Sequence, residues 1–118
     1  MRNFRELTIW QDSIDLATEV CVISRNFPPE ERYALGDQMR RAAVSIPSNI
    51  AEGSGRASES DFTHFLDIAL GSSYELETQL YIARNLKYID EGQCKLLIDK
   101  NCSIQRRIVA FIQKIRAN

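Results

Sequence analysis

The sequence has few of the residues from which catalytic and metal sites are usually built. Its 118 residues include one histidine, one tryptophan, three cysteines and three prolines. An odd number of cysteines in a chain of this size suits a reduced setting better than a disulfide framework. We therefore expect a cytoplasmic protein whose core forms without covalent cross-links.

Long apolar runs are also missing from the sequence. No stretch approaches the roughly 20 apolar residues that span a bilayer, and the opening segment, MRNFRELTIWQDS, carries charges and no apolar signal core. We expect neither membrane contact nor export. The length is sufficient for one buried core and no segment resembles a linker, so residues 1–118 are predicted to form a single domain.

Glycine and proline divide the chain into four stretches in which apolar residues recur at spacings of three and four. This spacing predicts amphipathic helices, with approximate bounds 8–26, 30–54, 58–87 and 90–116. Ser58 and Asp90 are suitable N-terminal caps, and Gly53 and Gly55 permit the left-handed conformation that often ends a helix. The prediction is an all-α, antiparallel up-down-up-down four-helix bundle.

The phase of each helix predicts its buried seam. The seam of the first helix is Trp10, Ile14, Ala17, Cys21 and Ser24, widened by Ile9, Leu16, Val20, Ile23 and Phe27. The seam of the fourth is Cys94, Leu97, Asn101, Ile104, Ile108, Phe111 and Ile115. Asn101 is polar, and we expect it to fix the helix register by pairing with another buried polar group.

Two helices carry a second apolar face that a lone bundle does not need. The residues of these faces are Ala43, Val44, Pro47 and Ala51 on the second helix, and Leu70, Tyr74 and Tyr81 on the third. We interpret them as an oligomer interface with a second copy of the chain. Stacking on nucleic-acid bases is the alternative for the two tyrosines. Pro47 lies inside its helix and crowds the preceding turn, so we expect a kink there.

A set of polar residues lies near Pro47 and in the adjoining part of the third helix. Its members are Ser48, Asn49, Glu52, Ser72, Ser73 and Glu75. A catalytic site would need a nucleophile and a base within reach of each other, and no histidine or cysteine lies nearby in the sequence. We interpret the set as a structural polar network that braces the kink.

The single histidine does not predict a metal site. His64 lies three residues after Asp61 and three before Asp67, whereas di-iron bundles pair two Glu-x-x-His motifs with further carboxylates. Cys94 and Cys102 are eight residues apart, too far for one metal or a local disulfide. We expect no metal, no cofactor, no catalytic residue and no enzymatic activity.

The net charge of −1 is unevenly distributed along the chain. Residues 93–118 include six basic residues and one acid, so the first 92 residues carry a charge of −6. A basic terminal segment suits an anionic partner, and a solvated helix face is the alternative. Candidate nucleic-acid contacts are Arg40, Arg41, Arg106, Arg107 and Lys114. For Arg40 and Arg41 the alternative is ion pairing with Asp37, Glu52 or a neighbouring subunit.

One long motif resembles a known family. QMRRAAVSIPSNIAEGSGR, followed by FLDIALGSSYELETQL, is similar to the 23S rRNA intervening-sequence proteins, and FRELTIWQDSIDLA and FPPEERYALGDQ extend the resemblance over nearly the whole chain. The resemblance implies a four-helix bundle that assembles as a homopentamer. It also implies kinship with the accessory protein of diversity-generating retroelements, a basic pentamer that contacts nucleic acid and a reverse transcriptase. This chain differs from that relative because its net charge is near zero.

Two functional hypotheses follow. The first is a non-enzymatic, ring-like homo-oligomer, a pentamer by resemblance, that binds RNA, DNA or a ribonucleoprotein partner. The alternative is a protein-only scaffold or regulatory module without nucleic-acid contact, which the near-zero net charge favours.

Overall fold

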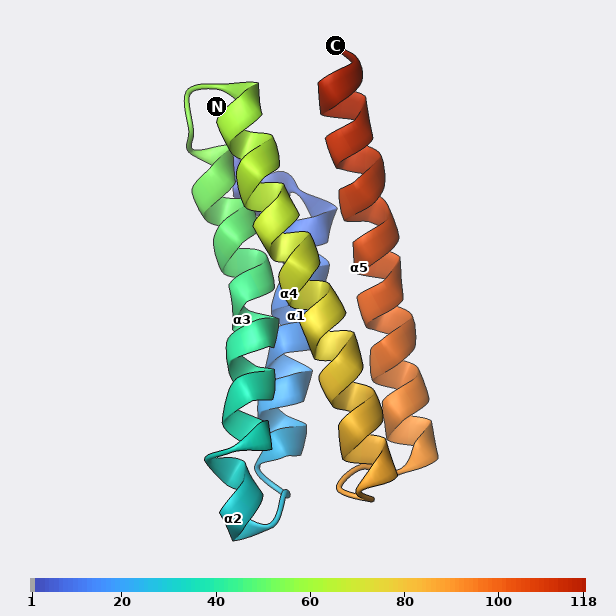
Figure 1. The fold of residues 1–118 in the computed structure, drawn as a ribbon. Helices are drawn as coiled ribbons and strands as arrows, with labels where there is room; N and C mark the ends of the chain where they lie inside the picture. Colours follow the sequence, from blue (N-terminus) through green and yellow to red (C-terminus); the bar gives the residue numbers. More distant parts are fainter. Residues whose placement is uncertain (1) are drawn as a thin grey trace.

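The computed structural model describes residues 2–118 and contains four long helices in an antiparallel bundle (Figure 1). The elements are η1 Phe4–Glu6, α1 Thr8–Ser24, α2 Pro29–Arg32, α3 Leu35–Ser54, α4 Glu59–Asn85 and α5 Glu91–Ala117. α3 lies beside α1 and α4, and α5 lies beside α4 and α1, so α1 is diagonal to α4 and α3 is diagonal to α5. The bundle measures 46 × 22 × 20 Å. The predicted all-α bundle is confirmed.

The helix starts follow the predicted caps. The Ser58 hydroxyl accepts a hydrogen bond from the backbone N–H of Asp61 at 3.0 Å. Asp90 and Gln93 form a reciprocal capping box, with hydrogen bonds of 2.7 and 3.1 Å. None of the helices in the described part of the chain combines the length and the apolar character that crossing a membrane would require.

The second predicted helix is divided in two. A break at Tyr33 and Ala34 separates the short α2 from α3. The break is stabilised because Arg40, one turn into α3, donates a hydrogen bond of 2.7 Å to the carbonyl of Arg32. Beyond this point α3 runs through Pro47 without interruption.

The seam predicted for α1 is confirmed only in part. The buried residues of α1 are Ile9, Ser13, Leu16, Ala17, Val20 and Ser24. Trp10 and Cys21 are only half-buried and Ile14 is 39% exposed. Both apolar stripes have helical spacing, and the stripe that faces the core is the one that can contact α3 and α5 together. The predicted residues that are buried are Ile9, Leu16, Ala17, Val20, Ser24 and Phe27. Trp10, Ile14 and Cys21 form the part of the predicted seam that lies outside the core.

The seam of α5 agrees with the prediction at all but one position. Its buried residues are Cys94, Leu97, Asn101, Ile104, Ile108, Ile112 and Ile115. Phe111, expected in the seam, is half-buried and packs edge-on against Phe62, with ring centroids 5.5 Å apart. Asn101 pairs with a buried polar group as predicted. It accepts a hydrogen bond from the Ser73 hydroxyl at 2.7 Å and donates one to the Ser73 carbonyl at 2.9 Å.

Gly53 has a packing role instead of the predicted role in ending the helix. Neither Gly53 nor Gly55 has a positive φ. A Cβ at Gly53 would lie 2.6 Å from the Cβ of Phe65 and 2.9 Å from Cδ1 of Phe62. Glycine at this position therefore lets the end of α3 approach the start of α4 closely.

Candidate interaction surfaces

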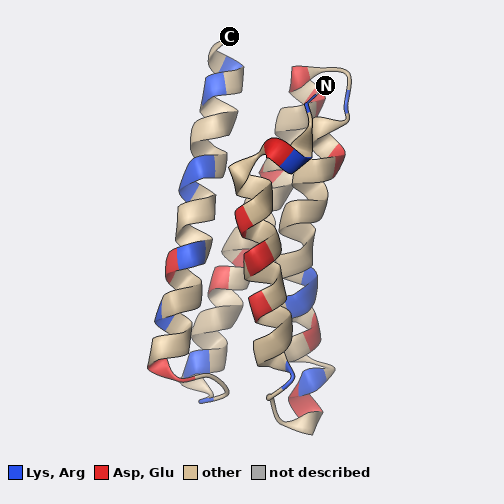
Figure 2. Cartoon of the chain, turned by 180° about the vertical axis from the view of Figure 1, so that it is seen from behind, with Lys and Arg blue, Asp and Glu red and all other residues tan. Residues whose placement is uncertain are grey.

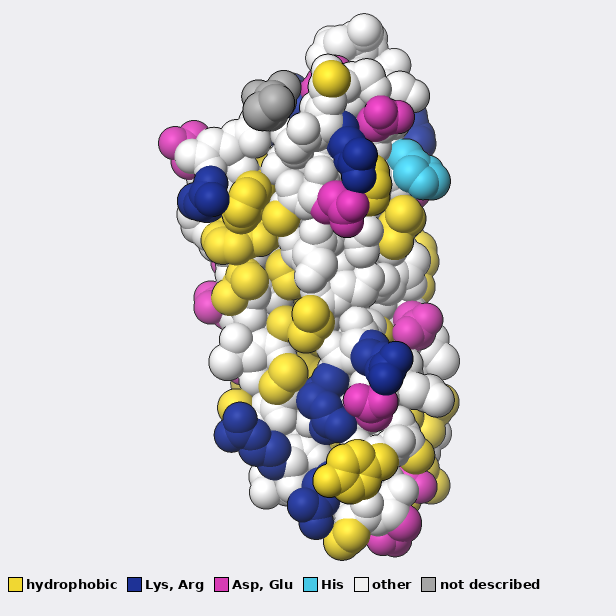
Figure 3. Space-filling model, turned by 90° about the vertical axis from the view of Figure 1, so that its left-hand side faces the viewer, with side chains coloured by type: hydrophobic (Ala, Val, Ile, Leu, Met, Phe, Trp, Pro, Cys, Tyr) yellow, Lys and Arg dark blue, Asp and Glu magenta, His cyan; other side chains and the backbone are white. Residues whose placement is uncertain are grey.

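A large apolar hollow, which we call the α1/α3 groove, runs between these two helices. It encloses about 490 Å³ and is lined by Phe4, Trp10, Ile14, Ala17, Thr18, Cys21, Val44, Pro47, Ser48 and Ala51. Figure 3 shows apolar side chains gathered along this boundary. The stripe of α1 that fails to face the core thus meets the second face of α3, and together they form one continuous apolar surface.

Only some side chains of the second face of α3 are exposed on the surface of the bundle. Val44 is 46% exposed, Ala51 is half-buried, and Pro47 is buried in the floor of the groove. Ala43 is 1% exposed and belongs to the core of the single chain. Its assignment to an oligomer interface is corrected, because its side chain is covered by the chain's own helices.

The second face of α4, which we call the tyrosine ridge, consists of Leu70, Tyr74 and Tyr81. Tyr74 is 50% exposed, Tyr81 is 37% exposed and Leu70 is half-buried. Tyr81 lines a shallow hollow with Cys94 and Ile98 of α5, so the ridge lies on the α5 side of α4. Because α4 is diagonal to α1, the tyrosine ridge and the α1/α3 groove occupy opposite sides of the bundle.

The predicted polar network is divided into separate parts. Ser45 and Ser72 share a hydrogen bond of 2.8 Å between α3 and α4, and Asn49 donates to the carbonyl and hydroxyl of Ser45 at 2.8 and 2.9 Å. The Ser73 side chain instead lies in the core, where its hydroxyl donates a hydrogen bond to Asn101.

The remaining members of the predicted network lie outside it. Ser48 and Glu75 are exposed, and Glu52 pairs with Arg56 at 2.9 Å. Ser45, which joins Ser72 and Asn49 in the structure, was not among the residues predicted for the network.

The five cations proposed for nucleic-acid contact do not form one surface. Arg107 pairs with Asp12 of α1 at 2.7 Å, and the neighbouring Lys100 pairs with Glu19. Figure 2 shows acidic residues along α1 and basic residues along α5. Within residues 2–118, Arg106 and Lys114 form no salt bridge. Arg40 and Arg41 lie on α3, diagonal to α5.

Basic residues are instead gathered where α1, α2 and α3 meet, as Figure 3 shows in the lower half of the view. We call this group the arginine corner: Arg25, Arg32, Tyr33, Arg40 and Arg41. Arg40 connects two parts of the arginine corner. It donates hydrogen bonds to the Ser24 hydroxyl at 2.9 Å and to the Arg32 carbonyl at 2.7 Å. Arg32 and Tyr33 were not predicted because the break after α2 was predicted as continuous helix. Arg25, which follows the last residue of α1, was not predicted either.

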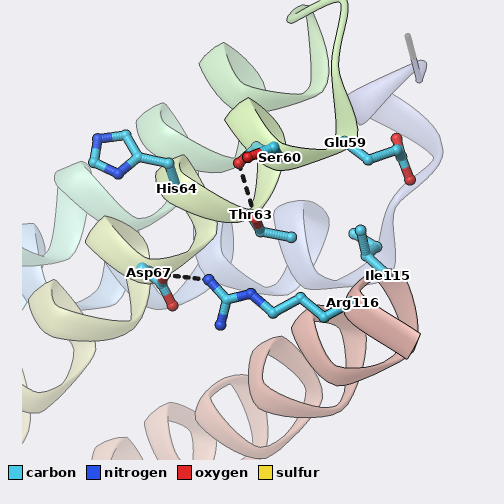
Figure 4. Close-up of a pocket in the computed structure, with 7 residues that line it drawn as sticks. All are labelled: Glu59, Ser60, Thr63, His64, Asp67, Ile115 and Arg116. Carbon is cyan, nitrogen blue, oxygen red and sulfur yellow. Dashed lines mark hydrogen bonds and ion pairs between the residues drawn. The ribbon is translucent and has the colours of Figure 1, made fainter. Parts of the chain in front are cut away.

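A hollow at the opposite end of the bundle contains the one histidine (Figure 4). Within it, Arg116 pairs with Asp67 at 2.7 Å, and the Thr63 hydroxyl donates to the Ser60 carbonyl of its own helix at 2.8 Å. His64 is exposed and packs edge-on against Phe65, with centroids 5.7 Å apart. Within residues 2–118, no group of three histidine, cysteine or acidic side chains converges on a metal position.

The cysteines are free thiols, and Cys94 and Cys102 have raised pKa values. Cys94 is buried, and its thiol lies 3.7 Å from the Leu80 carbonyl. Burial raises the pKa of Cys94 above its usual value, and burial followed by the charge of Glu77 raises the pKa of Cys102. A protonated thiol is a poor nucleophile and a poor metal ligand.

These observations define a helical-bundle protein with two opposed apolar surfaces and a basic corner. The sequence profile of the 23S rRNA-intervening sequence proteins matches residues 5–110. The chain therefore belongs to the 23S rRNA-intervening sequence protein family.

A solved structure is similar in fold. It is a protein of unknown function from the S23 ribosomal protein family of Bacteroides thetaiotaomicron VPI-5482, with a TM-score of 0.83 and 23% identity. The alignment covers 88% of this chain and 97% of that chain. No curated protein matches the sequence significantly.

Proposed function

We propose that this protein is a non-enzymatic helical assembly: a ring-like homo-oligomer, a pentamer by the family resemblance, that binds a partner containing RNA or DNA. The observation that supports assembly is the pair of apolar surfaces on opposite sides of one bundle. Two different surfaces that fit each other give a head-to-tail contact, and such contacts close into a ring when the rotation between copies allows it.

The composition of the two surfaces supports their pairing. The α1/α3 groove is concave and lined almost entirely by apolar side chains, while the tyrosine ridge presents Tyr74, half-exposed, as a projecting aromatic. Tyrosine is enriched in protein interfaces, where its ring fills apolar pockets and its hydroxyl stays near water. We therefore infer that the tyrosine ridge of one copy enters the α1/α3 groove of the next.

The first test is a charge placed in the groove. Val44→Glu should yield a folded protein of lower mass, because the 46% exposed side chain tolerates a carboxylate in water but not in a buried interface. Ala43 is unsuitable for this test, because a charge at that buried position would unfold the chain. Mass is measured by light scattering and helicity by circular dichroism.

Gln38→Glu is the matched control. It adds the same charge to the same helix, two turns before Ser45 and so on the side that faces α4. The control should assemble like the unaltered chain. If Val44→Glu also keeps the full mass, the groove is not a subunit interface and the proposal of assembly through it is wrong.

The second part of the proposal, nucleic-acid binding, is supported by the exposed arginines of the arginine corner. Its test is binding of structured RNA and duplex DNA across a salt series, with mass measured in the same samples. If the affinity falls as the salt concentration rises, the slope of log K against log salt gives the number of phosphates that the protein neutralises. Assembly without binding at low salt would favour a protein partner.

A further inference from the structure

We propose that the arginine corner binds single-stranded nucleic acid, with its arginines on phosphates and Tyr33 stacked on an unpaired base. The inference rests on the proposed function, since it names and places the partner of the assembly. It is carried by the contacts and exposure of five side chains, in the following steps.

The corner has a local excess of positive charge. Arg25 and Arg32 are exposed and form no salt bridge within residues 2–118. Arg40 and Arg41 share one carboxylate, that of Asp37, at 3.7 and 3.2 Å. The four arginines of the corner therefore form salt bridges with only one acid among the described residues, and this excess of charge favours a polyanion.

The two acids of α2 do not neutralise this charge. Glu30 and Glu31 lie close enough to Tyr88 that their charges, after burial, contribute to raising the pKa of its hydroxyl. Tyr88 in turn packs against Phe27, with ring centroids 5.4 Å apart. Within residues 2–118, neither acid forms a salt bridge with an arginine of the corner.

The corner is preorganised by Arg40. Its guanidinium is fixed by the Ser24 hydroxyl and the Arg32 carbonyl, so it ties the end of α1 to the break after α2. Arg41 pairs with Asp37, yet its side chain is 80% exposed and accessible to a ligand. Arginine binds phosphate through two parallel N–H groups, which makes these residues suitable for phosphate contacts.

Tyr33 distinguishes a nucleic acid from other polyanions. It is 86% exposed, more than any other large apolar residue of the described chain, and it lies in the break directly after Arg32. Aromatic side chains beside a basic groove stack on bases of single strands. A base within a duplex is already stacked on its neighbours, so this contact requires an unpaired base.

The basic residues of α5 are less suited to binding nucleic acid than those of the arginine corner. Arg107 and Lys100 are paired with acids of α1, which would repel a phosphate backbone. Arg106 and Lys114 are exposed and lie on the helix diagonal to α3. They therefore provide a control with the same change of charge at a distance from the corner.

The experiment measures fluorescence anisotropy of labelled oligo(U) and oligo(dT) of about 12 nucleotides, across a salt series and with mass determined in the same samples. Arg32→Gln/Arg41→Gln should weaken binding about tenfold and lower the slope of log K against log salt by about 1.4, since each phosphate contact contributes about 0.7 for a single strand. Arg106→Gln/Lys114→Gln should leave affinity and slope unchanged.

Tyr33 is tested by two substitutions. Tyr33→Ser should weaken binding by at least about fivefold through loss of stacking, and Tyr33→Phe should retain affinity. Binding of either oligonucleotide supports the inference, and the ratio of the two affinities identifies the preferred sugar.

Several results would overturn the inference. Unaltered affinity in the corner variants would reject it while leaving the proposed nucleic-acid function intact. A loss of mass in the same variants would identify the corner as a subunit contact. Equal competition by oligoglutamate would indicate an acidic protein partner, and equal binding of duplex would reject the stacking contact. No binding by the unaltered assembly would reject both the inference and the nucleic-acid part of the proposed function.

Discussion

At the scale of single residues, Gly53 and Gly71 differ in the space available for a Cβ atom. A methyl group at Gly53 would overlap Phe62 and Phe65, whereas Gly71 has no neighbouring atom within 4 Å of the position of a Cβ. We expect Gly53→Ala to lower the free energy of unfolding by about 1–3 kcal/mol through overpacking. Gly71→Ala, the control, should raise it by about 0.5–1 kcal/mol, because alanine restricts the unfolded chain and favours the helix.

Urea denaturation followed by circular dichroism measures both changes. The sequence identified Gly53 as special, but for the wrong reason. Its place near a helix end suggested a left-handed conformation, while the close approach of α3 to α4 depends on aromatic residues of another helix. The need for a residue without a Cβ at position 53 becomes visible only from the packing of α3 against α4. Equal stability of Gly53→Ala and the unaltered chain would contradict the close approach.

At the scale of helical elements, the buried pair of Ser73 and Asn101 sets the register of α4 against α5. Ser73→Ala removes the donor to the Asn101 amide oxygen, and we expect a loss of about 1–3 kcal/mol of stability, because a buried acceptor is left unsatisfied. Ser73→Ala/Asn101→Leu removes both partners and should recover much of that loss. Additive losses in this double-mutant cycle, measured by urea denaturation, would show that the two residues are not coupled.

The elements also show what a single sequence can and cannot predict. The caps at Ser58 and Asp90 and the seam of α5 depend on local spacing, so they could be predicted. The phase of α1 could not, because two apolar stripes of equal spacing compete and only contact with α3 and α5 decides between them. The arginine corner depends on the break at Tyr33, which a tertiary hydrogen bond from Arg40 to Arg32 stabilises.

At the scale of the whole molecule, the diagonal placement of α1 and α4 would give the proposed assembly a direction. The outward stripe of α1 adds Trp10 and Ile14 to the second face of α3, and so enlarges the α1/α3 groove on one side only. The tyrosine ridge occupies the other side. One copy thus carries both halves of the proposed contact, and a substitution in either half disables only that half.

This direction can be tested by mixing two defective variants. Val44→Glu disables the groove and Tyr74→Glu disables the ridge, so each alone should remain smaller than the unaltered assembly. In an equimolar mixture, the intact ridge of the first variant should bind the intact groove of the second and form a heterodimer that cannot extend further. Native mass spectrometry distinguishes the two chains by mass. If grooves pair with grooves across a two-fold axis, the mixture will form no heterodimer, and the head-to-tail arrangement will be wrong.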